Sequence, residues 1–297
     1  MKIALALCVL LCAVALVNAS EMRLIKAKNG KTITMQKLAK ELNKYDLVFF
    51  GEFHDNATIH QMQRELLPLI DSKRELILSF EMFERDVQSV LDAYLSGKID
   101  EAEFIEKARP WGNYASDYRP LIEFAKDHKM KAIAANVPRY LAGKLARQGM
   151  TFKDDLEPKE LSWMAQKLRA PEDEYRKAFI QTMNLADSAP HGMMDTTMNL
   201  ENMYQAQCLK DETMAESIVL AITKVAHARI IHFNGDFHSR NFLGTVSRVQ
   251  AALPKLKIAV ISPLFCADWQ KCSIDKQDRD SGTYLILLPE ASSGGEE

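Results

Sequence analysis

Six short apolar runs are spaced along the chain, and most of them are continuously apolar rather than alternating with polar residues. Strands that are buried on both faces of a parallel sheet have this pattern. The predicted strands are 46–50, 76–80, 131–135, 230–233, 257–261 and 283–288.

Helical periodicity fills the intervals between these runs. The first helical pattern follows Asp55 and Asn56, two residue types that cap helix N-termini. The predicted helices are 59–69, 87–95, 121–128, 172–185 and 197–223. Because strands and helices alternate, the sequence predicts an α/β fold: a doubly wound, mostly parallel sheet flanked by helices.

One long segment interrupts the alternation. Residues 149–223 show helical patterns and no strand pattern, so we expect a helical insertion subdomain there. The α/β domain then comprises 20–148 and 224–290. The end of the chain, 291–297, consists of Ala, Ser, Gly and Glu and is predicted to be a disordered tail.

The N-terminus has the pattern of a secretory signal peptide. Lys2 precedes an apolar run over 3–17, and Val17-Asn18-Ala19 places compact residues before Ser20. The run is shorter than the ~20 residues of a membrane span, although an uncleaved anchor is the alternative. We therefore predict cleavage of 1–19 and export to the periplasm or cell envelope. The rest of the chain has no transmembrane pattern, and leucine precedes both early cysteines, which argues against a lipid anchor.

Composition, charge and missing motifs exclude several classes of function. Lys and Arg number 38 against 40 Asp and Glu in 297 residues, a formal charge of −2, so no basic excess exists to neutralise nucleic-acid phosphates. Walker loops, Gly-x-Gly-x-x-Gly and Gly-x-Ser-x-Gly motifs are absent from the sequence. After signal cleavage three cysteines remain. Exported proteins keep disulfides, and Cys266 and Cys272 are close enough to pair, which leaves Cys208 free; a reduced pair is the alternative.

Polar residues gather just after the predicted strands, at the edge where open α/β sheets bind ligands. Two Gly-x-x-His turns begin at Gly51 and Gly235, and we expect their glycines to let the backbone turn sharply. Histidines with carboxylates can hold Zn²⁺, Mn²⁺ or Fe²⁺. The candidate metal ligands are Glu52, His54, His60, Glu81 and His238. A metal there would activate water for a metal-dependent hydrolase; the alternative is that these residues only cap helices and loops.

Taken in order, these motifs resemble a known family. Gly51-Glu52-Phe53-His54, Ser79-Phe80-Glu81-Met82-Phe83, Asn136-Val137-Pro138-Arg139 and the late Gly235-x-x-His238 are similar to the ChaN-like haem-binding uptake proteins of the Tiki/EreA/TraB superfamily. The segment 207–215 resembles the long helix of that family, and the resemblance spans 46–263. Two features depart from the family: no lipobox is present, and the late turn reads Asn-Gly-Asp-Phe-His where Gly-Asn-Gly-His is more usual.

The resemblance implies a ChaN-like α/β sheet with a helical subdomain, export to the envelope, and haem binding linked to iron acquisition. It also implies a homodimer that sandwiches haem, with a tyrosine on the iron. Haem needs an apolar slot, an axial ligand and partners for its propionates. The candidate haem-binding residues are Tyr175, His191, Tyr204 and Arg139, the last as a carboxylate partner.

Methionines accompany these candidates. The insertion holds Met183, Met193, Met194, Met198, Met203 and Met214. Methionine suits an adaptable apolar surface, although the same residues can simply fill a helical core. The sequence therefore predicts a haem-binding envelope protein without assigned catalytic residues, and a metal-dependent hydrolase as the alternative.

Overall fold

The computed structural model describes residues 22–71, 73–187 and 199–290. They form a seven-stranded sheet in the order β1-β7-β6-β2-β5-β3-β4, in which every neighbouring pair is parallel except β1 and β7. The strands are β1 (Arg23–Lys26), β2 (Leu47–Glu52), β3 (Leu76–Glu84), β4 (Lys131–Asn136), β5 (Arg229–Gly235), β6 (Ile258–Cys266) and β7 (Tyr284–Pro289). The predicted α/β class with a mostly parallel sheet is confirmed.

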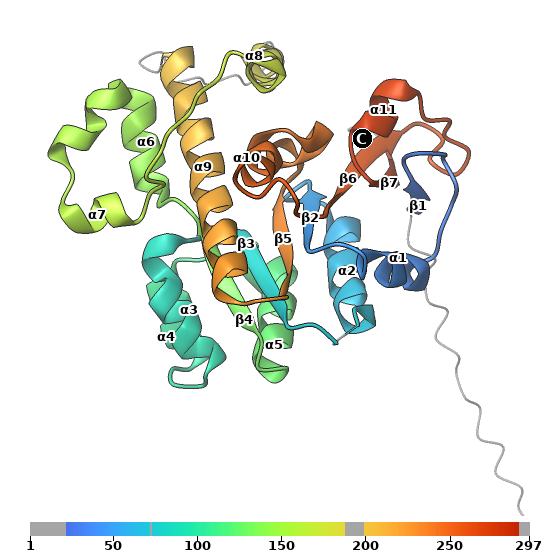
Figure 1. Ribbon diagram of the computed structural model, residues 1–297, viewed down its shortest axis with the longest axis horizontal. Coiled ribbons are helices and arrows are strands. Elements are labelled where there is room, and N and C mark those ends of the chain that lie inside the picture. Colours follow the sequence, from blue (N-terminus) through green and yellow to red (C-terminus); the bar gives the residue numbers. More distant parts are fainter. Residues whose placement is uncertain (1–21, 72, 188–198, 291–297) are drawn as a thin grey trace, which may run out of the picture.

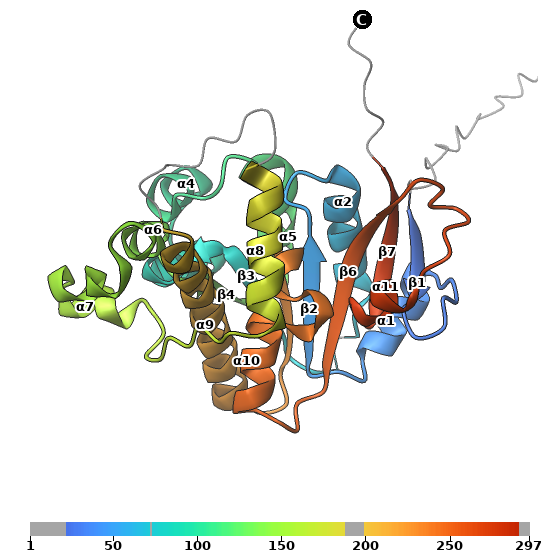
Figure 2. The ribbon, with the colours of Figure 1, turned by 90° about the horizontal axis from the view of Figure 1, so that it is seen from above.

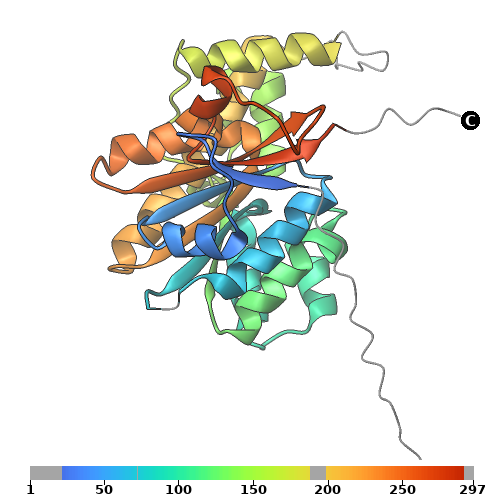
Figure 3. The same ribbon diagram turned by 90° about the vertical axis from the view of Figure 1, so that its right-hand side faces the viewer.

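Helices cover both faces of this sheet (Figures 1, 2 and 3). The helices are α1 (Met35–Leu42), α2 (Ala57–Leu66), α3 (Gln88–Leu95), α4 (Glu101–Ala108), α5 (Arg119–Asp127), α6 (Arg139–Gln148), α7 (Pro158–Ser162), α8 (Glu174–Asp187), α9 (Leu200–Lys224), α10 (Gly244–Ala252) and α11 (Lys276–Asp280). Helices α1 to α5 enclose the larger core with one face of the sheet. Helices α9 and α10 pack on the other face.

The six predicted strands are all present, and each ends one to five residues later than predicted. In β2 and β5 the added residues are buried as neighbours, with Gly51 paired to Asn234 and Glu52 to Gly235, whereas β3 ends at the half-buried Glu84. The short strand β1 was not predicted. It is a half-buried edge of four residues, too short to leave a pattern in the sequence.

In the described part of 149–223 the regular elements are helices, and irregular chain joins α7 to α8. Its long helix α9 belongs to two layers. Tyr204 and Cys208, in the first half, pack with α8, whereas Ala215 and Ile218, in the second half, pack on the sheet. The helical subdomain and the sheet therefore share one continuous helix (Figure 1).

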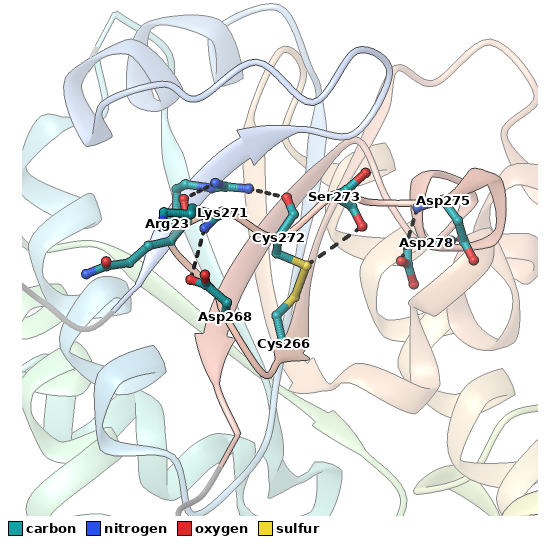
Figure 4. The surroundings of a disulfide bond; sticks show 9 residues. Arg23, Cys266, Asp268, Lys271, Cys272, Ser273, Asp275 and Asp278 are labelled. Atoms are coloured by element: carbon teal, nitrogen blue, oxygen red, sulfur yellow. Dashed lines mark hydrogen bonds between the residues drawn. A yellow bond between two sulfur atoms is a disulfide. The ribbon is translucent and has the colours of Figure 1, made fainter.

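The chain after β6 is closed by the predicted disulfide between Cys266 and Cys272, whose Cα atoms are 6.2 Å apart (Figure 4). The Arg23 guanidinium on β1 donates to the carbonyl oxygens of Gln270 and Cys272 and ties this loop to the sheet edge. Cys208 is a buried free thiol.

Two predicted segments, the signal peptide (1–19) and the tail (291–297), lie outside the described residues. Within the described ranges, none of the helices combines the length and apolarity that crossing a bilayer requires.

The edge strand β4 is covered by a side chain instead of another strand. The Gln88 amide donates from Nε2 to the carbonyl of Ala132 (2.9 Å), and its Oε1 accepts from the Ala134 N–H (2.8 Å). The amide thereby imitates a strand neighbour, and such cover protects sheet edges from unwanted pairing.

We expect Gln88→Ala to lower the free energy of unfolding by about 1–3 kcal/mol, because it leaves two edge groups of β4 without their partner. Urea denaturation measures this. Gln61→Ala is the matched control. Gln88 also donates to Asp92, four residues further along its helix, and Gln61 donates to Glu65 in the same way but has no hydrogen bond to a described strand. Equal losses in the two variants would contradict the edge-capping role.

Candidate functional site

An open cavity of about 860 Å³ lies at the carboxyl ends of β2, β3, β4 and β5. Four of the five predicted metal ligands line it: Glu52, His54, Glu81 and His238. The parallel arrangement of these strands places residues that are far apart in sequence at one edge, as the strand-end argument predicted.

Glu52 and His54 form a hydrogen-bonded pair at the cavity wall. The buried Glu52 carboxylate accepts from His54 Nδ1 (2.9 Å), from Tyr118 Oη (2.7 Å) and from Gln63 Nε2 (2.6 Å). The His54 side chain is 40% exposed and faces the cavity. Partial burial lowers the pKa of His54, but the Glu52 hydrogen bond and the charge of Glu81 outweigh it and raise the pKa above its ordinary value. His54 is therefore an oriented and accessible imidazole.

His238 is held between two carboxylates. Its Nε2 lies 3.3 Å from Glu81 Oε1, and its Nδ1 lies 2.8 Å from Asp211 Oδ1. Burial opposes the charge, yet the two acids raise the pKa of His238 to about 10. Burial likewise raises the pKa of Glu81 and of Asp211, but His238 more than offsets it and lowers both. His238 is therefore an imidazolium with no free lone pair.

The two glycines of the Gly-x-x-His turns are needed for space, which corrects the expectation of a sharp turn. Neither glycine has a positive φ. Gly51 is the last residue but one of β2, and Gly235 is the last residue of β5. A Cβ on Gly51 would stand 2.5 Å from Asp236 Oδ1, and one on Gly235 would stand 2.8 Å from His54 Nε2. Glycine thus lets neighbouring groups of the site approach the backbone.

The predicted metal ligands do not form a metal centre in this arrangement. Both ring nitrogens of His60 lie 3.0 Å from oxygens, the amide oxygen of Gln63 and the carbonyl of His54, so His60 supports the loop. Glu81 and His238 bind each other. Across 22–71, 73–187 and 199–290, no group of three or more His, Cys, Asp or Glu side chains is placed to hold a metal ion.

Asp211 is a member of the site that the sequence reasoning missed. Besides His238, it accepts from Tyr175 Oη (2.6 Å) and Thr245 Oγ1 (2.7 Å), so it joins α8, α9 and α10 to the strand end. Its signal in the sequence was its position on an apolar helical stripe with Tyr204, Cys208, Ala215 and Ile218. A carboxylate on such a stripe is buried and needs partners.

The predicted haem residues are placed differently from one another. Tyr175 and Tyr204 are buried, and burial raises the pKa of both phenols. Tyr175 donates to Asp211, and Tyr204 donates to the carbonyl of Pro171 (2.6 Å). The Arg139 side chain is 70% exposed and lines the cavity. His191, Met193, Met194 and Met198 lie outside the described residues.

A second cavity, the helical groove, adjoins the first between α6, α8 and α9, with a volume of about 310 Å³. Its apolar wall is formed by Ala142, Ala146, Phe179, Met183, Met203 and Ala206. Arg139 and Lys210 line both cavities and so mark their junction. Within the described part of the chain, Lys210 makes no hydrogen bond or ion pair.

Comparison with known proteins agrees with this architecture. A family model described as "Haem-binding uptake, Tiki superfamily, ChaN" matches residues 38–249. The structure of "Cofacial heme binding to ChaN of Campylobacter jejuni" has a TM-score of 0.65 and 17% identity, covering 92% of this chain and 98% of that one. A mutant of erythromycin esterase EreC in its open conformation has a TM-score of 0.52 and 10% identity, covering 92% and 98%. At these identities the two structures show the fold alone. No curated protein is similar enough in sequence to match.

The His238 imidazolium makes stability depend on pH. Its pKa is about 10 in the fold against an ordinary 6.5, so its contribution is complete below about pH 6.5 and is lost as the pH rises through about 10. We therefore expect the melting temperature of the native protein to fall more steeply between about pH 7 and 10 than that of His238→Gln. Circular dichroism melts measure both slopes, and Asp211→Asn should flatten the slope in part. Identical slopes in all three proteins would contradict the charged state of His238.

Proposed function

Since the chain belongs to the haem-binding uptake family of the Tiki superfamily, we propose that it is an exported protein that binds haem in the cell envelope and serves iron acquisition. The predicted signal peptide supports export. The disulfide between Cys266 and Cys272 supports an oxidising compartment, because such bonds persist outside the cytoplasm.

The helical groove is the site that we propose for the haem. Its wall of alanine, methionine and phenylalanine side chains matches the apolar face of a porphyrin, and methionine adapts to such flat surfaces. Arg139 and Lys210 at its end provide two cations for two propionates, and a guanidinium binds a carboxylate with two parallel hydrogen bonds. This pairing of an apolar wall with two cations is the observation that carries the proposal.

The iron ligand is proposed to be a tyrosine of the buried aromatic cluster beside the groove. Within this cluster Tyr204 packs against Phe179, a wall residue of the groove, and Tyr175 packs against Tyr204. Their hydroxyls are engaged with Asp211 and the Pro171 carbonyl, so ligation requires that one of these hydrogen bonds opens. His191 remains a further candidate ligand.

A homodimer is proposed for the haem-bound state. The groove volume of about 310 Å³ is at the lower end of the ~300–1,000 Å³ range of ligand pockets, so the groove covers only part of a macrocycle. The uncovered apolar face of the porphyrin would then favour association with a second copy. Light scattering with and without haemin tests whether the mass doubles on binding.

We expect Met203→Glu to weaken haemin binding by at least about tenfold, because it places a carboxylate against the apolar ring and unpaired buried charge is costly. A titration followed at the Soret band measures the affinity. Met150→Glu is the matched control, since Met150 is an exposed methionine outside the groove. No saturable Soret shift in the native protein would overturn haem binding, and equal affinities in the two variants would overturn the groove as its site.

Hydrolysis at the strand-end cavity is a second candidate function, favoured by the Glu52–His54 pair. Glu52 orients His54 and would stabilise its protonated form, which is how a histidine acts as general base toward water. Both ring nitrogens of His238 are bound to acids. A divalent metal in this hydrolase would therefore need a further ligand in place of His238.

For this hydrolase, a panel of p-nitrophenyl esters should show turnover that His54→Gln lowers by about 10²–10⁴-fold, the range of general-base contributions. His128→Gln is the control, because His128 is an exposed histidine near the opposite edge of the sheet. Elemental analysis of the same samples decides metal dependence. Absence of turnover with every ester, with or without added Zn²⁺ or Mn²⁺, would count against this function.

A further inference from the structure

A third cavity of about 690 Å³, the α6 groove, is adjacent to both the strand-end cavity and the helical groove. Its lining comes from α6, from the end of β3 and the turn after it, and from the residues that follow α4 and α7: Glu84, Asp86, Arg109, Arg139, Tyr140, Gly143, Arg147 and Trp163. Arg139 lines all three cavities. Asp86, Arg109, Tyr140, Arg147 and Trp163 line neither of the other two cavities.

The α6 groove has unbalanced positive charge. Its two acids, Glu84 and Asp86, are both bound by Arg109 Nη2, at 3.2 and 2.7 Å. Helix α6 carries Arg139, Lys144 and Arg147 and no acidic residue. Within the described ranges Arg147 has no hydrogen bond or ion pair, and Arg139 makes one long ion pair, from Nε to Glu84 Oε1 at 3.9 Å. The Arg147 guanidinium is therefore available to an anionic ligand, and so are the outer nitrogens of the exposed Arg139 guanidinium, whose contact with Glu84 is through Nε.

The geometry of α6 arranges these charges in a row. Arg139, Gly143 and Arg147 are spaced four residues apart and so lie on one side of the helix. A Cβ on Gly143 would stand 3.2 Å from Arg147 Nη1, so the glycine leaves room for this guanidinium to lie along the helix. Eight residues of α-helix span about 12 Å, the length of roughly four residues of extended chain.

Aromatic rings complete the groove. Tyr140 and Trp163 line it, and the Lys144 and Lys159 ammonium groups lie over these rings at 6.0 and 5.3 Å from the centroids. Arginine and aromatic side chains are enriched in protein interfaces. A guanidinium group also binds a carboxylate with two parallel hydrogen bonds.

We propose that the α6 groove docks an acidic, extended segment of a partner protein that exchanges haem with this chain. The proposal rests on the haem site proposed above, because the two grooves share Arg139. Carboxylates of the docked segment compete with a propionate for the Arg139 guanidinium. Docking therefore weakens the hold on haem and speeds its release to the partner.

Fluorescence anisotropy with a fluorescein-labelled peptide of about eight glutamates tests the docking surface. We expect the peptide affinity to fall as the salt concentration rises, because salt screens exposed ion pairs. We expect Arg147→Ala to weaken peptide binding about tenfold, the loss of one good ion pair, and Arg147→Lys to restore part of it. Lys73→Ala is the control, because Lys73 is exposed elsewhere. Equal binding by Arg147→Ala and the native protein, or tighter binding of the native protein to phosphatidylglycerol vesicles than to the peptide, would overturn the proposal.

Haem release is the second readout. The peptide should raise the rate of haem loss to apomyoglobin several-fold in the native protein and leave it unchanged in Arg147→Ala, whose own haem affinity stays native. A peptide that binds without changing the rate would overturn competition at Arg139. If the protein binds no haem, the proposed function fails, whereas the anisotropy result still decides whether the groove recognises acidic chains.

Discussion

Three buried charged groups meet between the sheet and α9, where His238 lies between Glu81 and Asp211. Each group alone would be expensive to bury, and together they satisfy one another. Glu81 also accepts from the Gly235 N–H (2.7 Å), which fixes the end of β3 to the end of β5. Removing one partner would leave an uncompensated charge, so the strand ends depend on all three being present.

Asp211 extends this charge cluster into the helical layer. It binds Tyr175 on α8 and Thr245 on α10, in addition to His238. Asp211 thus links α8 and α10 to His238, which lines the strand-end cavity. An imidazolium so held contributes charge and rigidity. His54, with Glu52 on one side and the cavity on the other, is the histidine placed for contact with a ligand.

The three cavities around α6 differ in the chemistry of the side chains that line them. The helical groove is apolar with cations at one end, the strand-end cavity is lined by paired acids and histidines, and the α6 groove is cationic and aromatic. Arg139, the first residue of α6, is common to the three. Its exposed guanidinium, which lies over the Trp111 ring at 5.7 Å, is the group through which ligands in different cavities would influence one another.

The sequence by itself determined the α/β class and the approximate positions of the six strands, because parallel strands buried on both faces must be continuously apolar. It also placed Glu52, His54, Glu81 and His238 at one edge, since parallel topology allows little else. Only the tertiary structure decided their partners. Whether an acid such as Glu81 binds a metal, a histidine or water depends on distances of a few tenths of an ångström between side chains from different elements. The roles of Asp211, Gly51 and Gly235 depend on side chains that are distant in sequence. A local sequence pattern does not show which distant residues become neighbours in the fold.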